Sequence, residues 1–228
     1  MNQTIRAIIF DFNGVIVDDE PIHFKATSRV LSELGIFLSD DDYNQNFLGC
    51  ADRESFSKII SERSSKPVAS PEVEKLIARK SDYYLDVISA GPPFVPGAID
   101  FIREAAGRYR LAIASGALRR EIDFVLSAGG LTDFFPVVIS ADDTSYSKPH
   151  PEAYQRVLEQ MEGGLQPADC VAIEDSTRGV ASAKNAGMKC LALTTTLSHE
   201  ALRDADWILP GFPPLKSVPW SAYSETVL

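Results

Sequence analysis

The sequence predicts an α/β fold, in which a doubly wound (Rossmann-like) parallel sheet forms the core and an α-helical cap domain is inserted into it. Two observations carry this prediction. Short apolar runs alternate with helical patterns along most of the chain, and one segment near the N-terminus shows helical patterns only. The length of 228 residues suits one large domain or a core with a small insertion, and 45% hydrophobic residues indicate ordinary globular packing.

The predicted strands set the layout of the sheet. Residues 5–10 are apolar nearly throughout, as is typical of strands buried on both faces of a parallel sheet. Similar runs follow at residues 111–114, 137–139, 171–173 and 190–193, with a sixth candidate at 207–209. Helical patterns lie between them at 96–109, 118–127, 151–160 and 177–187. This alternation predicts βαβ units.

The helical insertion interrupts that alternation after the first strand. Helical patterns occupy residues 20–34, 51–61 and 71–89, and Gly35 is a predicted C-cap of the first of them. Glycines and prolines between residues 91 and 97 mark the return to the core. We therefore expect residues 1–18 and 92–228 to form the α/β core and 19–91 the cap, with a surface tail over 210–228.

The net charge of -10 argues against a nucleic acid or an anionic membrane surface as the main partner, but it is compatible with a small phosphorylated substrate. No apolar run approaches the roughly 20 residues of a membrane span, and no signal-peptide pattern is seen, so we expect a cytoplasmic protein. The three cysteines form no CxxC pair and the three histidines no helical metal pair. We expect a monomer or a small homo-oligomer.

Candidate functional residues follow the predicted strands, where ligands bind in open parallel sheets. Each group alone also fits an ordinary turn, a helix cap or a solvated loop lysine. Together, on one rim, they indicate a site. They are Asp11, Asn13 and Gly14 after the first strand, Ser115 and Gly116 after the second, Lys148 after the third, and Glu174 and Asp175 after the fourth.

This set suits phosphoryl transfer. A carboxylate such as Asp11 can attack phosphorus and form an aspartyl-phosphate. Both reactants are anions, and Mg²⁺ held by carboxylates such as Asp11 and Asp175 would suppress their repulsion. Lys148 supplies a point charge and Ser115 a hydroxyl for the phosphoryl oxygens.

Four segments of this chain resemble the signature segments of the haloacid dehalogenase superfamily: FDFNGVIVDDE (residues 10–20), ASG (114–116), SKPHPEAY (147–154) and IEDSTRGVASAKNAGM (173–188). The helical insertion is similar to the cap of subclass I. The residues of the motifs are similar to those of the β-phosphoglucomutase and sugar-phosphate phosphatase branch. The similarity spans residues 5 to about 209.

The resemblance implies a role for each matching residue. Asp11 would be the nucleophile and a metal ligand, and Asn13 would offer its backbone carbonyl to Mg²⁺. Ser115, Gly116 and Lys148 would bind the phosphoryl group, while Asp175 and Glu174, directly or through water, would complete the metal site. In the cap, His23 lies where the branch has a histidine, and Arg53 is a candidate substrate contact or, equally, a solvated helix charge.

Asn13 departs from the pattern, because phosphatases and mutases of the family have a general acid–base aspartate there. An amide can donate a hydrogen bond but cannot pass on a proton. Three explanations stay open: substrates with good leaving groups, replacement of the acid by Asp19 or His23, or an introduced change that traps a complex. The dehalogenase and phosphonate hydrolase activities are disfavoured, since they use an aromatic residue, or a small residue with a cap lysine.

The sequence therefore predicts a Mg²⁺-dependent phosphohydrolase acting on a small phosphate ester, a sugar phosphate in particular. Two alternatives remain: a phosphomutase of the β-phosphoglucomutase type, and a weakly active phosphate-ligand-binding pseudoenzyme, which Asn13 would explain.

Overall fold

The computed structural model describes residues 4–63 and 70–220. The chain forms two compact units: Met1–Asp18 with Phe94–Leu228, called here the core unit, and Asp19–Pro93, called the helical unit.

The core unit is built on a parallel sheet with six strands in the described residues, in the order β3-β2-β1-β4-β5-β6. Its strands are β1 (Ala7–Phe10), β2 (Arg110–Ala114), β3 (Val137–Ile139), β4 (Cys170–Glu174), β5 (Lys189–Leu193) and β6 (Trp207–Leu209). The predicted doubly wound sheet is confirmed, including its sixth strand. Because β1 lies at the centre between β2 and β4, all four residues of β1 are buried.

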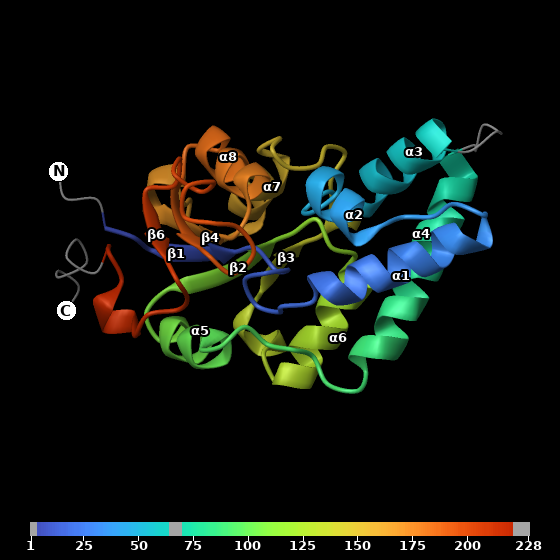
Figure 1. Cartoon of the computed structure of the whole chain (residues 1–228). Helices are drawn as coiled ribbons and strands as arrows, with labels where there is room; N and C mark the ends of the chain where they lie inside the picture. Colours follow the sequence, from blue (N-terminus) through green and yellow to red (C-terminus); the bar gives the residue numbers. More distant parts are fainter. Residues whose placement is uncertain (1–3, 64–69, 221–228) are drawn as a thin grey trace. The chain divides into compact units, whose positions relative to one another are not determined.

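Helices cover both faces of this sheet (Figure 1). On one face lie α7 (Glu152–Gln160) and α8 (Thr177–Asn185), and on the other α5 (Ala98–Ala106) and α6 (Arg119–Gly129). The first pair buries side chains such as Tyr154 and Ala183 against small strand residues such as Ala112 and Ala172. Among its described residues, the unit also has four short 3₁₀ segments: Thr132–Phe134, Ala141–Asp143, Pro167–Asp169 and Leu215–Ser217.

The helical unit contains α1 (Glu20–Glu33), α2 (Asp40–Asn46), α3 (Asp52–Arg63) and α4 (Ser70–Ile88). Gly35 follows α1 with φ of 73°, a conformation that glycine adopts readily, as the C-cap prediction required. Helix α2 was not expected, because it buries only Tyr43 and so shows no apolar period. It is specified instead by Ser39, whose side chain caps the amide of Asp42, and by acidic residues in its first turn.

The predicted surface tail is wrong for the described residues up to 220. Leu215, Val218 and Trp220 are buried, and the Phe212 ring contacts Phe10 and Phe101. The content of proline and serine suggested a solvated segment. The apolar side chains between them are nevertheless buried, because their removal from water stabilises the fold. Residues 221–228 lie outside the described residues.

Within residues 4–63 and 70–220, no helix combines the length and the apolar character needed to cross a bilayer.

Candidate active site

Three buried carboxylates meet where β1 and β4 end side by side. The amide of Asp11 donates to the carbonyl of Ile173, so Asp11 lies next to Glu174 and Asp175 at the carboxyl edge of the sheet. One oxygen from each of these three side chains lies within 4.8 Å of the others, and all three residues are buried. The parallel register thus brings together two sequence segments more than 160 residues apart.

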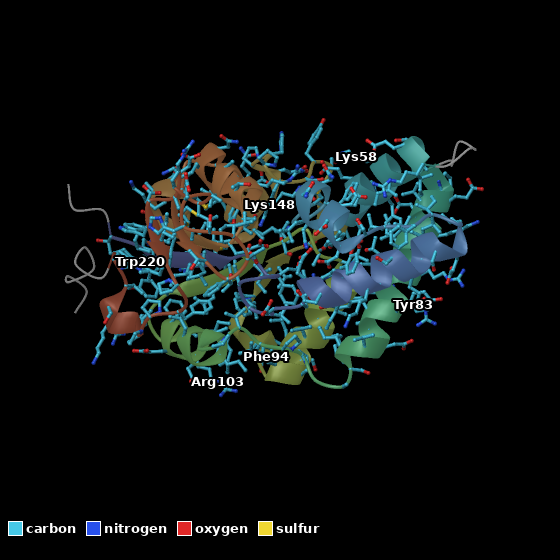
Figure 2. All side chains as sticks on the ribbon, viewed as in Figure 1. Lys58, Tyr83, Phe94, Arg103, Lys148 and Trp220 are labelled. Atoms are coloured by element: carbon cyan, nitrogen blue, oxygen red, sulfur yellow. The ribbon has the colours of Figure 1, made fainter. Side chains whose placement is uncertain are left out.

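Lys148 joins this group from the segment between β3 and α7, and it is labelled in Figure 2. Its Nζ lies 3.0 Å from Asp11 Oδ1 and 2.7 Å from Glu174 Oε1. Burial alone would lower the pKa of Lys148, but the carboxylates of Asp11 and Glu174 outweigh it and raise the pKa, so the ammonium stays charged.

One ammonium does not balance three carboxylates in this buried setting. Burial, together with the charge of Asp11, raises the pKa of Glu174 and raises that of Asp175 well above its usual value. Glu174 Oε2 is buried and has no hydrogen-bond partner among the described residues. A divalent cation fits this donor set, because hard cations prefer carboxylate oxygens and supply the charge that the cluster lacks.

Two glycines let the backbone approach these carboxylates closely. A Cβ on Gly14 would lie 1.9 Å from Asp175 Oδ2, and one on Gly179 would lie 1.8 Å from Glu174 Oε2. Any other residue at either position would displace a carboxylate. Behind them, Thr195 Oγ1 donates to the Gly14 carbonyl, and Thr196 hydrogen-bonds Asp175. These contacts fix the carboxylates against the loop that follows β1.

Ser115 and Gly116 directly follow β2, the other neighbour of β1. The Ser115 Oγ accepts a hydrogen bond from the amide of Ala117, which leaves its hydroxyl hydrogen to donate elsewhere. A Cβ on Gly116 would meet nothing within 4 Å, so the backbone there is open on that side. Asn13 lies in the turn after β1, half-buried and bridged to Val17.

In the helical unit, His23 belongs to a buried polar chain. Its Nδ1 lies 2.5 Å from Lys80 Nζ, and its Nε2 lies 3.3 Å from Asp19 Oδ2. Lys80 also donates to Asp52 at 2.9 Å, and the hydroxyl of Tyr84 donates to Asp19. An ammonium at Lys80 donates to His23 Nδ1, and both residues contact polar side chains of their own unit.

Arg53 lies on α3 with 72% of its side chain exposed and pairs with Glu74 of α4 at 3.0 Å. The guanidinium charge of Arg53 is thus paired with a carboxylate of the same unit.

Sequence reasoning missed several residues that contact the predicted groups, among them Tyr154, Gly179, Thr196 and Lys80. Tyr154 and Gly179 lie inside recognised motifs, and their sequence spacing from Glu174 could have identified them as its neighbours. Thr196 comes from the loop after β5, and Lys80 from a helix where lysine is common, so neither carries a local signal.

These features define a hydrolase of a known class. The chain belongs to the haloacid dehalogenase-like hydrolase family, whose family model matches residues 8–193. Its parallel sheet with the helical insert α1–α4 corresponds to the subclass I arrangement, and the relatives place it in the branch of CbbY, β-phosphoglucomutase and sugar-phosphate phosphatases.

Three relatives illustrate the similarity. Protein CbbY of Rhodobacter capsulatus is 29% identical over 90% of this chain and 93% of its own length. A phosphorylated carbohydrates phosphatase of Thermotoga maritima is 29% identical over 81% of this chain and 83% of its own. The crystal structure of a CbbY mutant from Rhodobacter sphaeroides, in complex with xylulose-1,5-bisphosphate, matches 97% of this chain and 96% of its own, with a TM-score of 0.82 at 26% identity.

Proposed function

We propose that the chain is a Mg²⁺-dependent phosphatase of small phosphate esters, sugar phosphates in particular, and that it works through an aspartyl-phosphate on Asp11. The observation that carries the proposal is the buried group of Asp11, Glu174 and Asp175, with Lys148 bonded to two of its members. Such a site offers a nucleophile, a cation site and a fixed positive charge within one cluster.

Each residue has a defined task in this reaction. Asp11 forms a bond to phosphorus while the bond from phosphorus to the ester oxygen breaks, and water later attacks the acyl phosphate and restores Asp11. Lys148, and the hydroxyl of Ser115, stabilise the phosphoryl oxygens as their charge is redistributed. Mg²⁺, held by Asp11, Asp175, Glu174 and the Asn13 carbonyl, would neutralise the approach of one anion to the other.

The preference for sugar phosphates is supported by the relatives. One is named for phosphorylated carbohydrates, and one was solved with a sugar bisphosphate. At 26 to 29% identity these names support a substrate class and not one compound.

The experiment is a release assay for inorganic phosphate over a panel of pentose, hexose and hexitol phosphates, with Mg²⁺ and with a chelator. We expect release from some of these esters only when Mg²⁺ is present. Release that is equal with and without the chelator, or no release from any ester, would contradict the proposal.

Asn13 favours a second candidate, a phosphate-ligand binder with little turnover, because an amide cannot protonate the leaving oxygen. Asn13→Asp separates the two. A gain of about 10²–10⁴-fold in turnover, the usual worth of general acid–base catalysis, would show that the site lacks its acid and works mainly as a binder. Unchanged turnover, in a chain that already releases phosphate, would show that another group supplies the proton.

A further inference from the structure

Tyr154 is a buried tyrosine of α7 whose hydroxyl reaches the candidate active site. Its side chain is fully buried, and its hydroxyl donates to Glu174 Oε1 at 2.6 Å. The ring itself packs in the apolar cluster beneath α7 and α8. A phenylalanine would fill that space equally well, so the packing does not explain why a hydroxyl is present.

The hydroxyl shares its acceptor with Lys148. Both groups donate to Oε1 of Glu174, at 2.6 Å from Tyr154 and 2.7 Å from Lys148, whereas Oε2 has no hydrogen-bond partner among the described residues. Glu174 thus has one oxygen held by two donors and one left for something else. That second oxygen lies against the backbone of Gly179.

The two donors differ in how firmly they belong to Glu174. Lys148 divides its ammonium between Glu174 and Asp11, 3.0 Å away, and the latter carboxylate must leave Lys148 for phosphorus if it is the nucleophile. Tyr154 makes its hydrogen bond to Glu174 alone. Tyr154 is therefore the donor that can hold the Glu174 carboxylate while the contacts of Lys148 change.

We propose that Tyr154 is a positioning residue for the cation site: its hydroxyl fixes the orientation of the Glu174 carboxylate beside Asp11 and Asp175, where this carboxylate would hold Mg²⁺ or a water bound to it. This inference rests on the proposed function, because it takes Glu174 to be part of the cation site. Partners that orient a metal ligand in this way contribute to metal affinity although they never touch the metal.

The test is Mg²⁺ binding to Tyr154→Phe by isothermal titration calorimetry on the metal-free protein. We expect the dissociation constant for Mg²⁺ to rise by about 10-fold or more, the usual effect of removing a partner of a metal ligand. The control is Tyr146→Phe, the same change at a tyrosine with 62% exposure in the segment that leads to Lys148. There the constant should stay within about twofold. Circular dichroism melts of both variants without metal check that they fold.

A double-mutant cycle asks whether Tyr154 acts through Glu174. In a Glu174→Gln background, adding Tyr154→Phe should change the Mg²⁺ constant by no more than about twofold, because the carboxylate it orients is already gone. An equal loss in both backgrounds, or an unchanged constant in Tyr154→Phe alone, would overturn the inference.

Failure of the proposed function is distinguishable from failure of this inference. A wild-type chain that binds no Mg²⁺ and releases no phosphate removes both. A wild-type chain that binds Mg²⁺ while Tyr154→Phe binds it equally well removes only the role of Tyr154.

Discussion

The two units of this protein both bury charged side chains, but they satisfy them in different ways. In the helical unit, Lys80 lies between His23 and Asp52, and Asp19 receives hydrogen bonds from its own unit. In the core unit, Lys148 pairs with Asp11 and Glu174 in a cluster that also contains the carboxylate of Asp175, and one buried oxygen of Glu174 has no hydrogen-bond partner among the described residues.

The difference separates a structural cluster from a binding site. Buried charges are tolerated when partners with suitable geometry surround them, and Lys80 and Asp19 have such partners within the helical unit. The core cluster meets that condition only if something positive is added. Local incompleteness of this kind is expected where a protein has been shaped for a ligand and not for stability alone.

The largest expected effect comes from Asp11→Asn. Loss of the nucleophile should reduce phosphate release by at least about 10⁴-fold. The same change removes one of three mutually repelling carboxylates, so the unfolding midpoint without metal should not fall and is expected to rise. Phosphate assays and thermal melts on one preparation measure both.

The matched change in the helical unit is Asp52→Asn, which removes a charge that Lys80 needs. It should lower the unfolding midpoint. If Asp11→Asn is the destabilised variant and Asp52→Asn the stabilised one, the contrast drawn between the two clusters is wrong.

Replacing the lysine of each cluster by methionine sharpens the comparison. Lys148→Met and Lys80→Met each break a largely buried pair, and each should cost up to about 3–5 kcal/mol in the metal-free protein. Mg²⁺ should stabilise the wild type and both variants, but only Lys148→Met should gain more stability from Mg²⁺ than the wild type does, because the cation replaces the lost positive charge beside Asp11 and Glu174. Urea unfolding of the wild type and of both variants, each with and without Mg²⁺, gives the six values.

For Lys80→Met, the shift produced by Mg²⁺ should equal that of the wild type. If Mg²⁺ raised the unfolding free energy of Lys80→Met more than that of Lys148→Met, the cation would bind in the helical unit, against this prediction.

The sequence was sufficient for the sheet and for the grouping of Asp11, Lys148, Glu174 and Asp175, because both depend on strong local signals. Strands such as residues 5–10 are apolar nearly throughout, and Asp11 and Lys148 each follow a predicted strand. Parallel pairing then forces strand ends together, so β1 and β4 had to bring Asp11 close to Glu174.

Contacts between side chains from distant segments could not be predicted from the sequence. The hydrogen bond from Tyr154 to Glu174 depends on how α7 packs on the sheet, and the contact of Thr196 with Asp175 depends on the path after β5. Burial of Trp220 was missed because the surrounding prolines and serines resemble a solvated tail. Helix α2 depends on caps and charges and has no apolar period.

Gly179→Ala should have an intermediate effect. Its Cβ would lie 1.8 Å from Glu174 Oε2, so the carboxylate has to move, at a cost of about 1–3 kcal/mol in stability and with weaker Mg²⁺ binding. The matched change in the helical unit is Gly35→Ala, where φ is 73° and nothing lies within 4 Å. It should cost about 1–2 kcal/mol from backbone strain and leave Mg²⁺ binding unchanged. Calorimetry with Mg²⁺ distinguishes them, and equal affinities would contradict the close approach at Gly179.

The smallest expected effect concerns Asp206, a charge in the core unit that is paired in the manner of the helical unit. It accepts hydrogen bonds from Lys184, Lys189 and the amide of Cys190. Burial alone would raise the pKa of Asp206, but these donors outweigh it and lower the pKa. A carboxyl with a lowered pKa stabilises the fold above its unfolded pKa of about 3.9, and this contribution is lost as the pH falls through the folded pKa.

Asp206→Asn should therefore cost about 1 kcal/mol or less at pH 7, since both lysines are partly exposed to solvent. The difference from the wild type should shrink as the pH drops below about 4, and also in about 1 M salt, which screens the pair. Urea unfolding at neutral and acid pH measures this difference. Mg²⁺ should not change it, because the charge of Asp206 is already matched by its own neighbours. If the difference in unfolding free energy between the wild type and Asp206→Asn grows at acid pH, or if Mg²⁺ abolishes it, the charge of Asp206 is not balanced by its own neighbours. Asp206 would then resemble the carboxylates of Asp11, Glu174 and Asp175.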